Sequence, residues 1–137
     1  MSSTSASTLS VAQLYEQQGE QLSLELMSES LESPVPILVS DINRPGMALM
    51  GFEENFLAER IQIIGRTEVA YLQTLGEAEQ KAALDRFFRF RVPCIIVAKG
   101  LEPPAGLLER ANRCRIPVLR TPQDTTPFIH QLTAYLD

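Results

Sequence analysis

The sequence predicts a single α/β domain whose mostly parallel β-sheet, of about five strands, is flanked by helices. Three observations support this prediction. Short apolar runs alternate with stretches of helical periodicity along the chain, which is the pattern of a sheet wrapped by helices. The 137 residues are enough for one ordinary domain, and 45% of them are hydrophobic, as in globular proteins. The apolar run at residues 92–98 is continuous, as expected for a strand covered on both faces.

The first half of the chain predicts one helix and three strands. Ser10 is a good N-cap for a helix through Gln18, and Gly19 can close it. Alternating leucines predict a strand at residues 22–26. Apolar runs predict a second strand at residues 37–39 and a third at 59–65. The connection between the first two strands lacks a helical pattern, so one of them can be antiparallel.

The second half of the chain predicts a regular alternation of helices and strands. The capping-box pattern at residues 74–77 predicts the start of a helix that continues to about Phe90. The clearest strand covers residues 93–98, and the last three strands should be parallel, joined by right-handed crossovers. The remaining predicted elements are a helix with Pro103 and Pro104 in its first turn, a strand at residues 116–119, and a final helix with Thr126 as N-cap and Pro127 as its first residue.

Composition excludes several classes of function. A nucleic-acid-binding domain should be basic, whereas this chain has a net charge of −5. Residues 92–98 form the longest clearly apolar run, far short of the ~20 residues of a membrane-spanning helix. Residues 1–9 are rich in Ser and Thr and have no secretory signal, so we expect a disordered leader, a domain at residues 10–137 and a cytoplasmic location. Without export, Cys94 and Cys114 are expected to be reduced thiols.

The candidate binding residues follow the strands. In open α/β sheets, ligands bind beyond the carboxyl ends of the strands. A cation follows each of the last four predicted strands, and neighbouring glycines allow a ligand to approach the backbone, so this edge suits an anion. The alternative is that the cations are solvated or pair with Asp41, Glu68 and Glu102. The candidate residues are Asp41, Asn43, Arg44, Gly65, Arg66, Thr67, Lys99, Gly100, Arg120 and Thr121.

Motifs for catalysis are incomplete. His130 is the only histidine and lies inside the final predicted helix, where a structural or surface role is typical. Residues 46–51 match the first six positions of the phosphate-binding loop Gly-x-x-x-x-Gly-Lys-Ser/Thr, but Phe52 and Glu53 follow in place of the lysine and the hydroxyl. The two glycines are better interpreted as helix boundaries or close-packing points. The spacing of residues therefore predicts no catalytic, cofactor-binding or metal-binding residue.

Most of the chain resembles the N-terminal domain of bacterial HPr kinase/phosphorylase. The combination of Arg-Pro-Gly, Ile-x-x-x-Gly-x-Thr-Glu and x-Gly-Leu-Glu-Pro-Pro in this order is specific. The resemblance rests on SVAQLYEQQGEQLSLEL (residues 10–26), SDINRPGMALMGF (40–52), ERIQIIGRTEVAYLQTL (59–75), VPCIIVAKGLEPPAGLLERA (92–111) and IPVLRTPQDTTPFIHQLTAYL (116–136).

The resemblance implies a parent enzyme of the phosphotransferase system that regulates carbohydrate metabolism. That enzyme is a cytoplasmic hexamer that uses ATP and Mg²⁺ to phosphorylate a serine of the phosphocarrier HPr, and it removes the phosphate by phosphorolysis. Its phosphate-binding loop and catalytic acid belong to a C-terminal domain, and the sequence of residues 1–137 contains no such loop. The implied fold is similar to the N-terminal domain of the Mur ligases.

The chain alone is therefore expected to be non-catalytic, with no cofactor of its own. Its expected partners are further copies of the chain, its own C-terminal kinase domain and, through the parent, HPr, but neither nucleic acid nor membrane. Two roles remain open from the sequence. One is a regulatory domain that senses a small anion, and the other is an interaction and oligomerisation module without a ligand.

Overall fold

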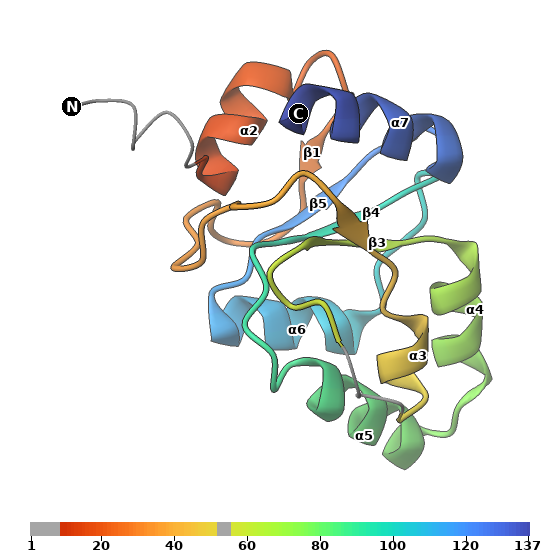
Figure 1. Ribbon diagram of the computed structural model, residues 1–137. Helices are drawn as coiled ribbons and strands as arrows, with labels where there is room; N and C mark the ends of the chain where they lie inside the picture. The colour runs from red at the N-terminus through yellow and green to blue at the C-terminus, as the bar shows by residue number, and fades with distance from the viewer. Residues whose placement is uncertain (1–8, 52–55) are drawn as a thin grey trace.

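A five-stranded sheet lies between two layers of helices in the computed structural model, which describes residues 9–51 and 56–137 (Figure 1). The strand order is β1-β5-β4-β3-β2. Strand β1 is antiparallel to β5, and all the other neighbours are parallel, as the sequence allowed. The strands are β1 (Glu25–Leu26), β2 (Ile42–Asn43), β3 (Ile61–Ile64), β4 (Ile95–Val97) and β5 (Val118–Arg120).

The helices form one layer on each face of the sheet. Helices α2 and α7 cover one face, and α3, α4, α5 and α6 cover the other (Figure 1). The predicted α/β class with a mostly parallel sheet is therefore confirmed. The bounds of the helices are α2 (Val11–Gln18), α3 (Gly46–Leu49), α4 (Arg66–Thr74), α5 (Glu77–Phe87), α6 (Ala105–Cys114) and α7 (Thr125–Leu136).

The core consists of two clusters that share the sheet. Side chains alternate across a strand, so Ile96 faces α2 and α7 while its neighbours Ile95 and Val97 face α3 to α6. All three are fully buried, as predicted. On the α2 and α7 side, the strands contact Leu14 and Phe128. The opposite cluster contains Leu72, Leu84, Phe87, Leu107 and Ala111 from its helices.

The predicted strand at residues 37–39 is wrong. Ile37 forms only an isolated antiparallel bridge with Leu9, and the side chain of Leu38 is 60% exposed. Pro36 has no N–H to donate to a ladder, which restricts pairing in this segment. The chain enters the sheet later, where Ile42 pairs with Ile61 in β3. The first predicted strand is shorter than expected, since Ser23 has a φ of 56° and only Glu25–Leu26 pairs with β5.

The helix predicted to start at residue 74 is α5, which starts later, and the helix before it, α4, was not predicted from the sequence. Thr74 is the last residue of α4, and its hydroxyl donates to the carbonyl of Tyr71 instead of capping a new helix. Leu75 is extended, and α5 begins after Gly76, whose N–H donates to the carboxylate of Glu79. Only the glutamate half of a capping box operates here, because Gly76 has no side chain to accept a hydrogen bond in return. Helix α5 also ends at Phe87 rather than near Phe90.

Other helix boundaries follow the sequence closely. Ser10 caps α2 in a reciprocal capping box with Gln13, as the N-cap prediction requires. Gly46 begins α3 and Gly51 follows it with a φ of 104°, so these glycines are helix boundaries. Asp124 rather than Thr126 is the N-cap of α7, so Pro127 lies within the first turn, where its missing N–H is tolerated.

Three further features concern the leader, the cysteines and the length of the helices. Residues 1–8 of the predicted leader lie outside the described residues, whereas Leu9 pairs with Ile37. Cys94 is buried and Cys114 is exposed, and both are free. In the described parts of the chain, no helix is long and apolar enough to cross a membrane.

Candidate functional site at the carboxyl ends of the strands

The carboxyl ends of four parallel strands meet at one edge of the sheet, as the sequence predicts. Arg44 follows β2, Gly65 follows β3, Lys99 follows β4 and Thr121 follows β5. Helices α4 and α7 begin at the same edge, at Arg66 and Thr125. This edge of the sheet, with the ten candidate residues named above, is called the carboxyl edge below.

Arg44 lies against the backbone of β3. A Cβ atom on Gly65 would lie 2.8 Å from Nη2 of Arg44 and 3.0 Å from the hydroxyl of Thr125. Both distances are tight for a Cβ atom, so a side chain at residue 65 would displace the side chains of Arg44 and Thr125; glycine serves close approach here rather than a special backbone conformation. The structure thus brings together Arg44, Gly65 and Thr125, and the sequence had suggested only the first two.

Glu68 binds Arg44 and caps α4. Nη2 of Arg44 donates to Oε1 of Glu68 at 2.8 Å, and the N–H of Gly65 donates to the same oxygen at 2.9 Å. The side chain of Glu68 is 4% exposed and that of Arg44 37%. A nearly buried carboxylate with two donors is well stabilised. The Arg-Pro-Gly segment is therefore part of a structural network around the first turn of α4.

Lys99 and Gly100 form the turn after β4. Both have a left-handed backbone, with φ values of 62° and 64°, which a glycine adopts freely and a lysine rarely does. Their N–H groups donate to the carbonyls of Gln123 and Thr121 at 2.8 Å. The ammonium of Lys99 is 3.4 Å from Oδ1 of Asp124. This turn is consequently bound to the turn after β5.

Arg120 points toward the antiparallel edge strand. Its guanidinium donates to Glu25 at 2.9 and 3.2 Å and to Glu102 at 2.9 Å. Hydrogen bonding, first to Glu25 and then to Glu102, raises the pKa of Arg120. The hydroxyl of Thr121 is buried and donates to the carbonyl of Leu22 at 2.8 Å. These two residues therefore fasten β1 to β5.

The other candidates are spread along the same edge. Asn43 donates its amide to Gln62 at 2.8 Å, and Asp41 is 3.7 Å from Nη2 of Arg60 rather than beside Arg44. Arg66 and Thr67 are exposed in the first turn of α4. Within residues 9–51 and 56–137, no side-chain hydrogen bond or ion pair involves these last two residues.

The arrangement supports recognition rather than covalent chemistry. Three of the four strand-end cations, Arg44, Lys99 and Arg120, already contact carboxylates, and an anion would compete with them. Among the described residues, no group of three or more His, Cys, Asp or Glu side chains could hold a metal ion. The anion site at this edge stays a prediction.

Several partners were not foreseen from the sequence. Glu68 was expected as one possible partner of Arg44, and its position three residues after Gly65 is the signal of a helix cap. Asp124, Thr125 and Glu25 had no such signal, because folding alone brings them to the edge.

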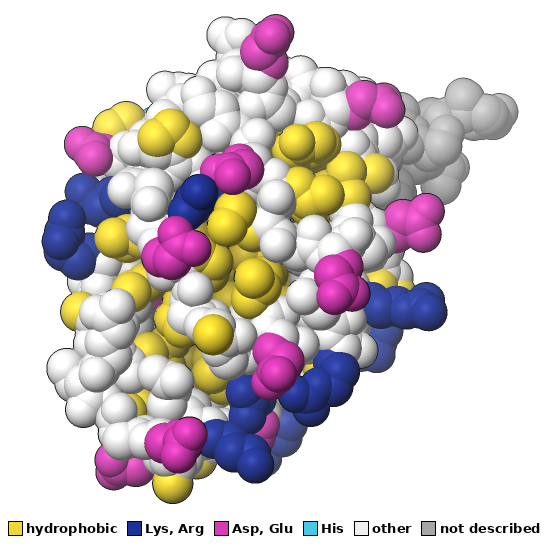
Figure 2. All heavy atoms as spheres, turned by 180° about the vertical axis from the view of Figure 1, so that it is seen from behind, with side chains coloured by type: hydrophobic (Ala, Val, Ile, Leu, Met, Phe, Trp, Pro, Cys, Tyr) yellow, Lys and Arg dark blue, Asp and Glu magenta, His cyan; other side chains and the backbone are white. Residues whose placement is uncertain are grey.

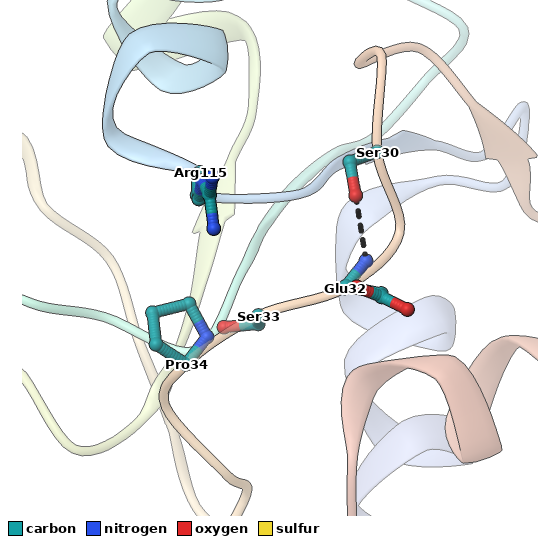
Figure 3. Close-up of a pocket in the computed structure, with 5 residues that line it drawn as sticks. All are labelled: Ser30, Glu32, Ser33, Pro34 and Arg115. Carbon is teal, nitrogen blue, oxygen red and sulfur yellow. Dashed lines mark hydrogen bonds between the residues drawn. The ribbon is translucent and has the colours of Figure 1, made fainter.

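Hollows in the surface lie at the other end of the strands. One, of about 480 Å³, is lined by Ser30, Glu32, Ser33, Pro34 and Arg115 (Figure 3). The hydroxyl of Ser30 accepts a hydrogen bond from the N–H of Glu32 at 3.1 Å, which shapes its wall. The motif analysis did not point to this region.

Comparison with known proteins identifies the family. The family described as HPr serine kinase N terminus matches residues 9–136. The chain belongs to this family. The resemblance noted from the sequence is thereby confirmed, and it extends over nearly the whole chain.

Similar members of the HPr serine kinase family are longer than this chain. The HPr kinase/phosphorylase of Alkaliphilus metalliredigens is 43% identical over 122 residues, which is 86% of this chain and 40% of the relative. That of Clostridium perfringens is 42% identical over 114 residues, or 83% and 37%. That of Chloroherpeton thalassium is 39% identical over 132 residues, or 95% and 39%. The chain thus spans between 37% and 40% of the length of these relatives.

A solved structure with the same fold is more distant. The CBS and DRTGG domains of the regulatory region of Clostridium perfringens pyrophosphatase, complexed with diadenosine tetraphosphate, superpose with a TM-score of 0.58 at 20% identity. The match covers 97% of this chain and 48% of the other. At this identity the likeness supports the fold alone. The similarity to the Mur ligase N-terminal domain stays a prediction.

Proposed function

We propose that this chain is the non-catalytic N-terminal regulatory and assembly domain of an HPr kinase/phosphorylase. The observation that carries the proposal is the family match over residues 9–136. The attached kinase would use ATP and Mg²⁺ to phosphorylate a serine of HPr, and would reverse that step, in the cytoplasm. Its catalytic loop would lie in the part of the relatives that this chain does not cover. Its partners would be HPr, the C-terminal kinase domain and other copies of the chain.

Assays of ATP turnover test the non-catalytic part of the proposal. Residues 1–137 should neither hydrolyse ATP nor transfer phosphate to HPr, because their sequence lacks the lysine and hydroxyl that hold magnesium and phosphate. The control is the full-length HPr kinase/phosphorylase of Clostridium perfringens under the same conditions. Phosphate transfer by the pure chain above the buffer background would contradict the proposal.

The regulatory part of the proposal places a small anion at the carboxyl edge. The convergence of Arg44, Arg66 and Lys99 beyond parallel strands supports it, together with the first turns of α4 and α7. Arg66 is exposed beside the N-terminus of α4, so an anion there would meet a cation and the positive end of a helix dipole.

Thermal unfolding in different salts tests this anion site. Phosphate should raise the melting temperature more than chloride at matched ionic strength, and Arg66→Gln with Lys99→Gln should abolish the specific part. Phosphate also stabilises proteins by exclusion from their surface, and that part should persist in the variant. The matched control is Lys81→Gln, which removes an exposed cation from the middle of α5. An equal phosphate response in all three proteins would remove the anion from the proposal.

The observed ion pairs favour a second candidate function. Because Arg44, Lys99 and Arg120 each contact a carboxylate, these three cations of the carboxyl edge need no ligand to balance their charge. The domain would then act as an interaction and oligomerisation module that only orders copies of the kinase. A sedimentation experiment showing self-association that is insensitive to phosphate would support this function.

A further inference from the structure

Four arginines line one groove at the amino ends of β4 and β5. The groove has a volume of about 560 Å³. Its walls are residues 88–92, which connect α5 to β4, residues 113–116 at the end of α6, and residues 34–35. Viewed from behind, Lys and Arg side chains gather at one end of the molecule, on the side where α5 and α6 end (Figure 2). The arginines are Arg89, Arg91, Arg113 and Arg115.

This concentration of charge is unusual for the chain as a whole. The protein has only 12 Lys and Arg residues and a net charge of −5, yet a third of its cations line this groove. Helix dipoles explain part of the arrangement, because the negative ends of α5 and α6 both point here. They do not explain Arg91, which lies beyond the last turn of α5 and next to β4.

Two of the four groove arginines differ from most cations of the carboxyl edge in having no carboxylate partner among the described residues. Arg91 and Arg115 are exposed, and within the described residues their side chains have no hydrogen bond or ion pair. Arg113 pairs with Glu109 at 3.3 Å, but both side chains are about 70% exposed, and such surface pairs are weak. Among the residues that the structure describes, no acidic side chain lines the groove.

The cap of α6 fixes the backbone of one of these arginines. Arg115 is the C-cap of α6 and has a left-handed backbone with φ of 60°, and its N–H donates to the carbonyls of Ala111 and Asn112. Its side chain projects from the end of the helix into the hollow beside Ser33 and Pro34 (Figure 3). The αL cap thus directs a guanidinium away from the helix that carries it.

Apolar side chains lie between the arginines. Phe88 and Phe90 line the groove, and the ring of Phe90 stacks on that of Phe56 with centroids 4.1 Å apart. Phe88 meets Phe87 edge to face at 5.0 Å, which joins the groove to the core. The remaining apolar lining consists of Pro34, Val35, Val92 and Ile116. A ligand for this groove should therefore combine carboxylates with an apolar group.

We propose that this groove is a docking site for an acidic segment of a partner protein, a short extended peptide with an apolar side chain between its carboxylates. Guanidinium groups bind carboxylates through paired hydrogen bonds. A short peptide can stay within the groove, where repulsion from acidic residues more than about 8 Å away is screened at physiological ionic strength. A nucleic acid would extend past the groove and meet Glu29 and Glu32, which line the adjoining hollows.

Fluorescence anisotropy with a labelled peptide of alternating glutamate and leucine tests the proposal. Wild-type protein should bind this peptide and should not bind the same peptide with lysine in place of glutamate. Binding should weaken as salt is added. In Arg91→Gln with Arg115→Gln the dissociation constant should rise at least about tenfold, which corresponds to about 1.4 kcal/mol. Lys81→Gln, which removes a cation outside the groove, should leave binding unchanged.

Several outcomes would overturn the proposal. The first is that the wild type does not bind the peptide, and the second is that the double variant binds it equally well. The third is that a single-stranded oligonucleotide of the same length binds the wild type as tightly as the peptide does and loses this binding in the double variant. A self-association measured by sedimentation and abolished by the double variant would make a second copy of this chain the occupant instead. If the double variant does not fold, Arg91→Gln alone is decisive, because an unchanged dissociation constant would then contradict the proposal. The phosphate experiment at the carboxyl edge is independent of these results.

Discussion

The two edges of the sheet use their cations differently. At the carboxyl edge, Arg44 contacts Glu68, Lys99 contacts Asp124 and Arg120 contacts Glu25 and Glu102. At the amino edge, in the groove at the ends of α5 and α6, the exposed Arg91 and Arg115 have no carboxylate partner within the described residues. The edge that general rules for α/β sheets select for ligands is the one where three of the four strand-end cations already contact carboxylates.

This difference in charge pairing follows from the helix ends that lie at each edge. Helix N-termini at the carboxyl edge favour acidic residues, and Glu68 and Asp124 occupy those positions and then attract cations. Helix C-termini at the amino edge favour cations directly, and no carboxylate is needed to place them. Arg44, Lys99 and Arg120 at the first edge therefore have a structural role, whereas Arg91 and Arg115 at the second remain available for a partner.

The largest effect on stability is expected between the edges, in β4. Ile96→Ala should lower the free energy of unfolding by roughly 2–5 kcal/mol, because it removes a fully buried side chain and leaves a cavity. Urea denaturation measures the change. Leu38→Ala is the control, since that side chain is 60% exposed and should change stability little. A loss below about 1 kcal/mol for Ile96→Ala would show that β4 is not the centre of the sheet.

Removing one arginine from each edge tests the comparison directly. Arg44→Gln should cost about 1–3 kcal/mol, because it deprives the nearly buried carboxylate of Glu68 of a charged donor. Arg91→Gln should change stability by no more than about 0.5 kcal/mol, as for an exposed side chain without a partner. Both are measured by urea denaturation. Equal costs would mean that the two edges do not differ in the way described.

The reactivity of the two cysteines distinguishes the interior of the protein from the amino-edge groove. Burial raises the pKa of the Cys94 thiol to about 12, so almost no thiolate forms at pH 8. Cys114 is exposed and lines the groove, so it should react first. Mass spectrometry after alkylation should show one modified thiol in the native protein and two in urea. Native Cys114→Ser should show none, and modification of Cys94 in that variant would indicate opening of the sheet.

The smallest effect is expected at an ion pair outside both edges. A hydrogen bond from Nε of Arg110 at 2.9 Å lowers the pKa of Asp85 below its usual 3.8. The pair therefore stabilises the fold above that pH, and this contribution is lost as the pH falls through the lowered pKa. Acid denaturation should show a stability difference between wild type and Asp85→Asn that shrinks below pH 3.8. A constant difference down to lower pH would mean that the pair does not form.

Sequence reasoning succeeded where a pattern is continuous. The run of isoleucines in β3 and the apolar run in β4 have no alternative interpretation in a domain of this size, so both strands were predicted. Helix boundaries that depend on a choice between similar patterns were not predicted correctly. Residues 74–77 fit the capping-box pattern, but Thr74 ends α4, and α5 begins after Gly76, which carries no pattern of that kind.

The location of the candidate residues at the strand ends was predicted, but not their partners, and the anion site itself stays a prediction. The order of strands and cations along the chain places Arg44, Lys99 and Arg120 at one edge. Their partners could not be read from the sequence, since Glu25 lies 95 positions from Arg120 and Asp124 lies 25 positions from Lys99. The amino-edge groove was missed for the same reason, because its walls come from three segments that only the fold brings together.

The pairing of β1 with β5 has a consequence for the synthesis of the protein. Residues Glu25 and Arg120 are 95 positions apart, so at about 5–20 residues per second a ribosome needs about 5 to 20 seconds to supply the partner of β1. The burial of helix α2 is completed still later, because Val11 and Leu14 belong to a core cluster that also requires Phe128 and Leu132 of α7. Throughout that interval the apolar face of the amphipathic helix α2, which carries Val11 and Leu14, lacks its cover in the nascent chain, so we expect a chaperone at the ribosome exit to contact this face.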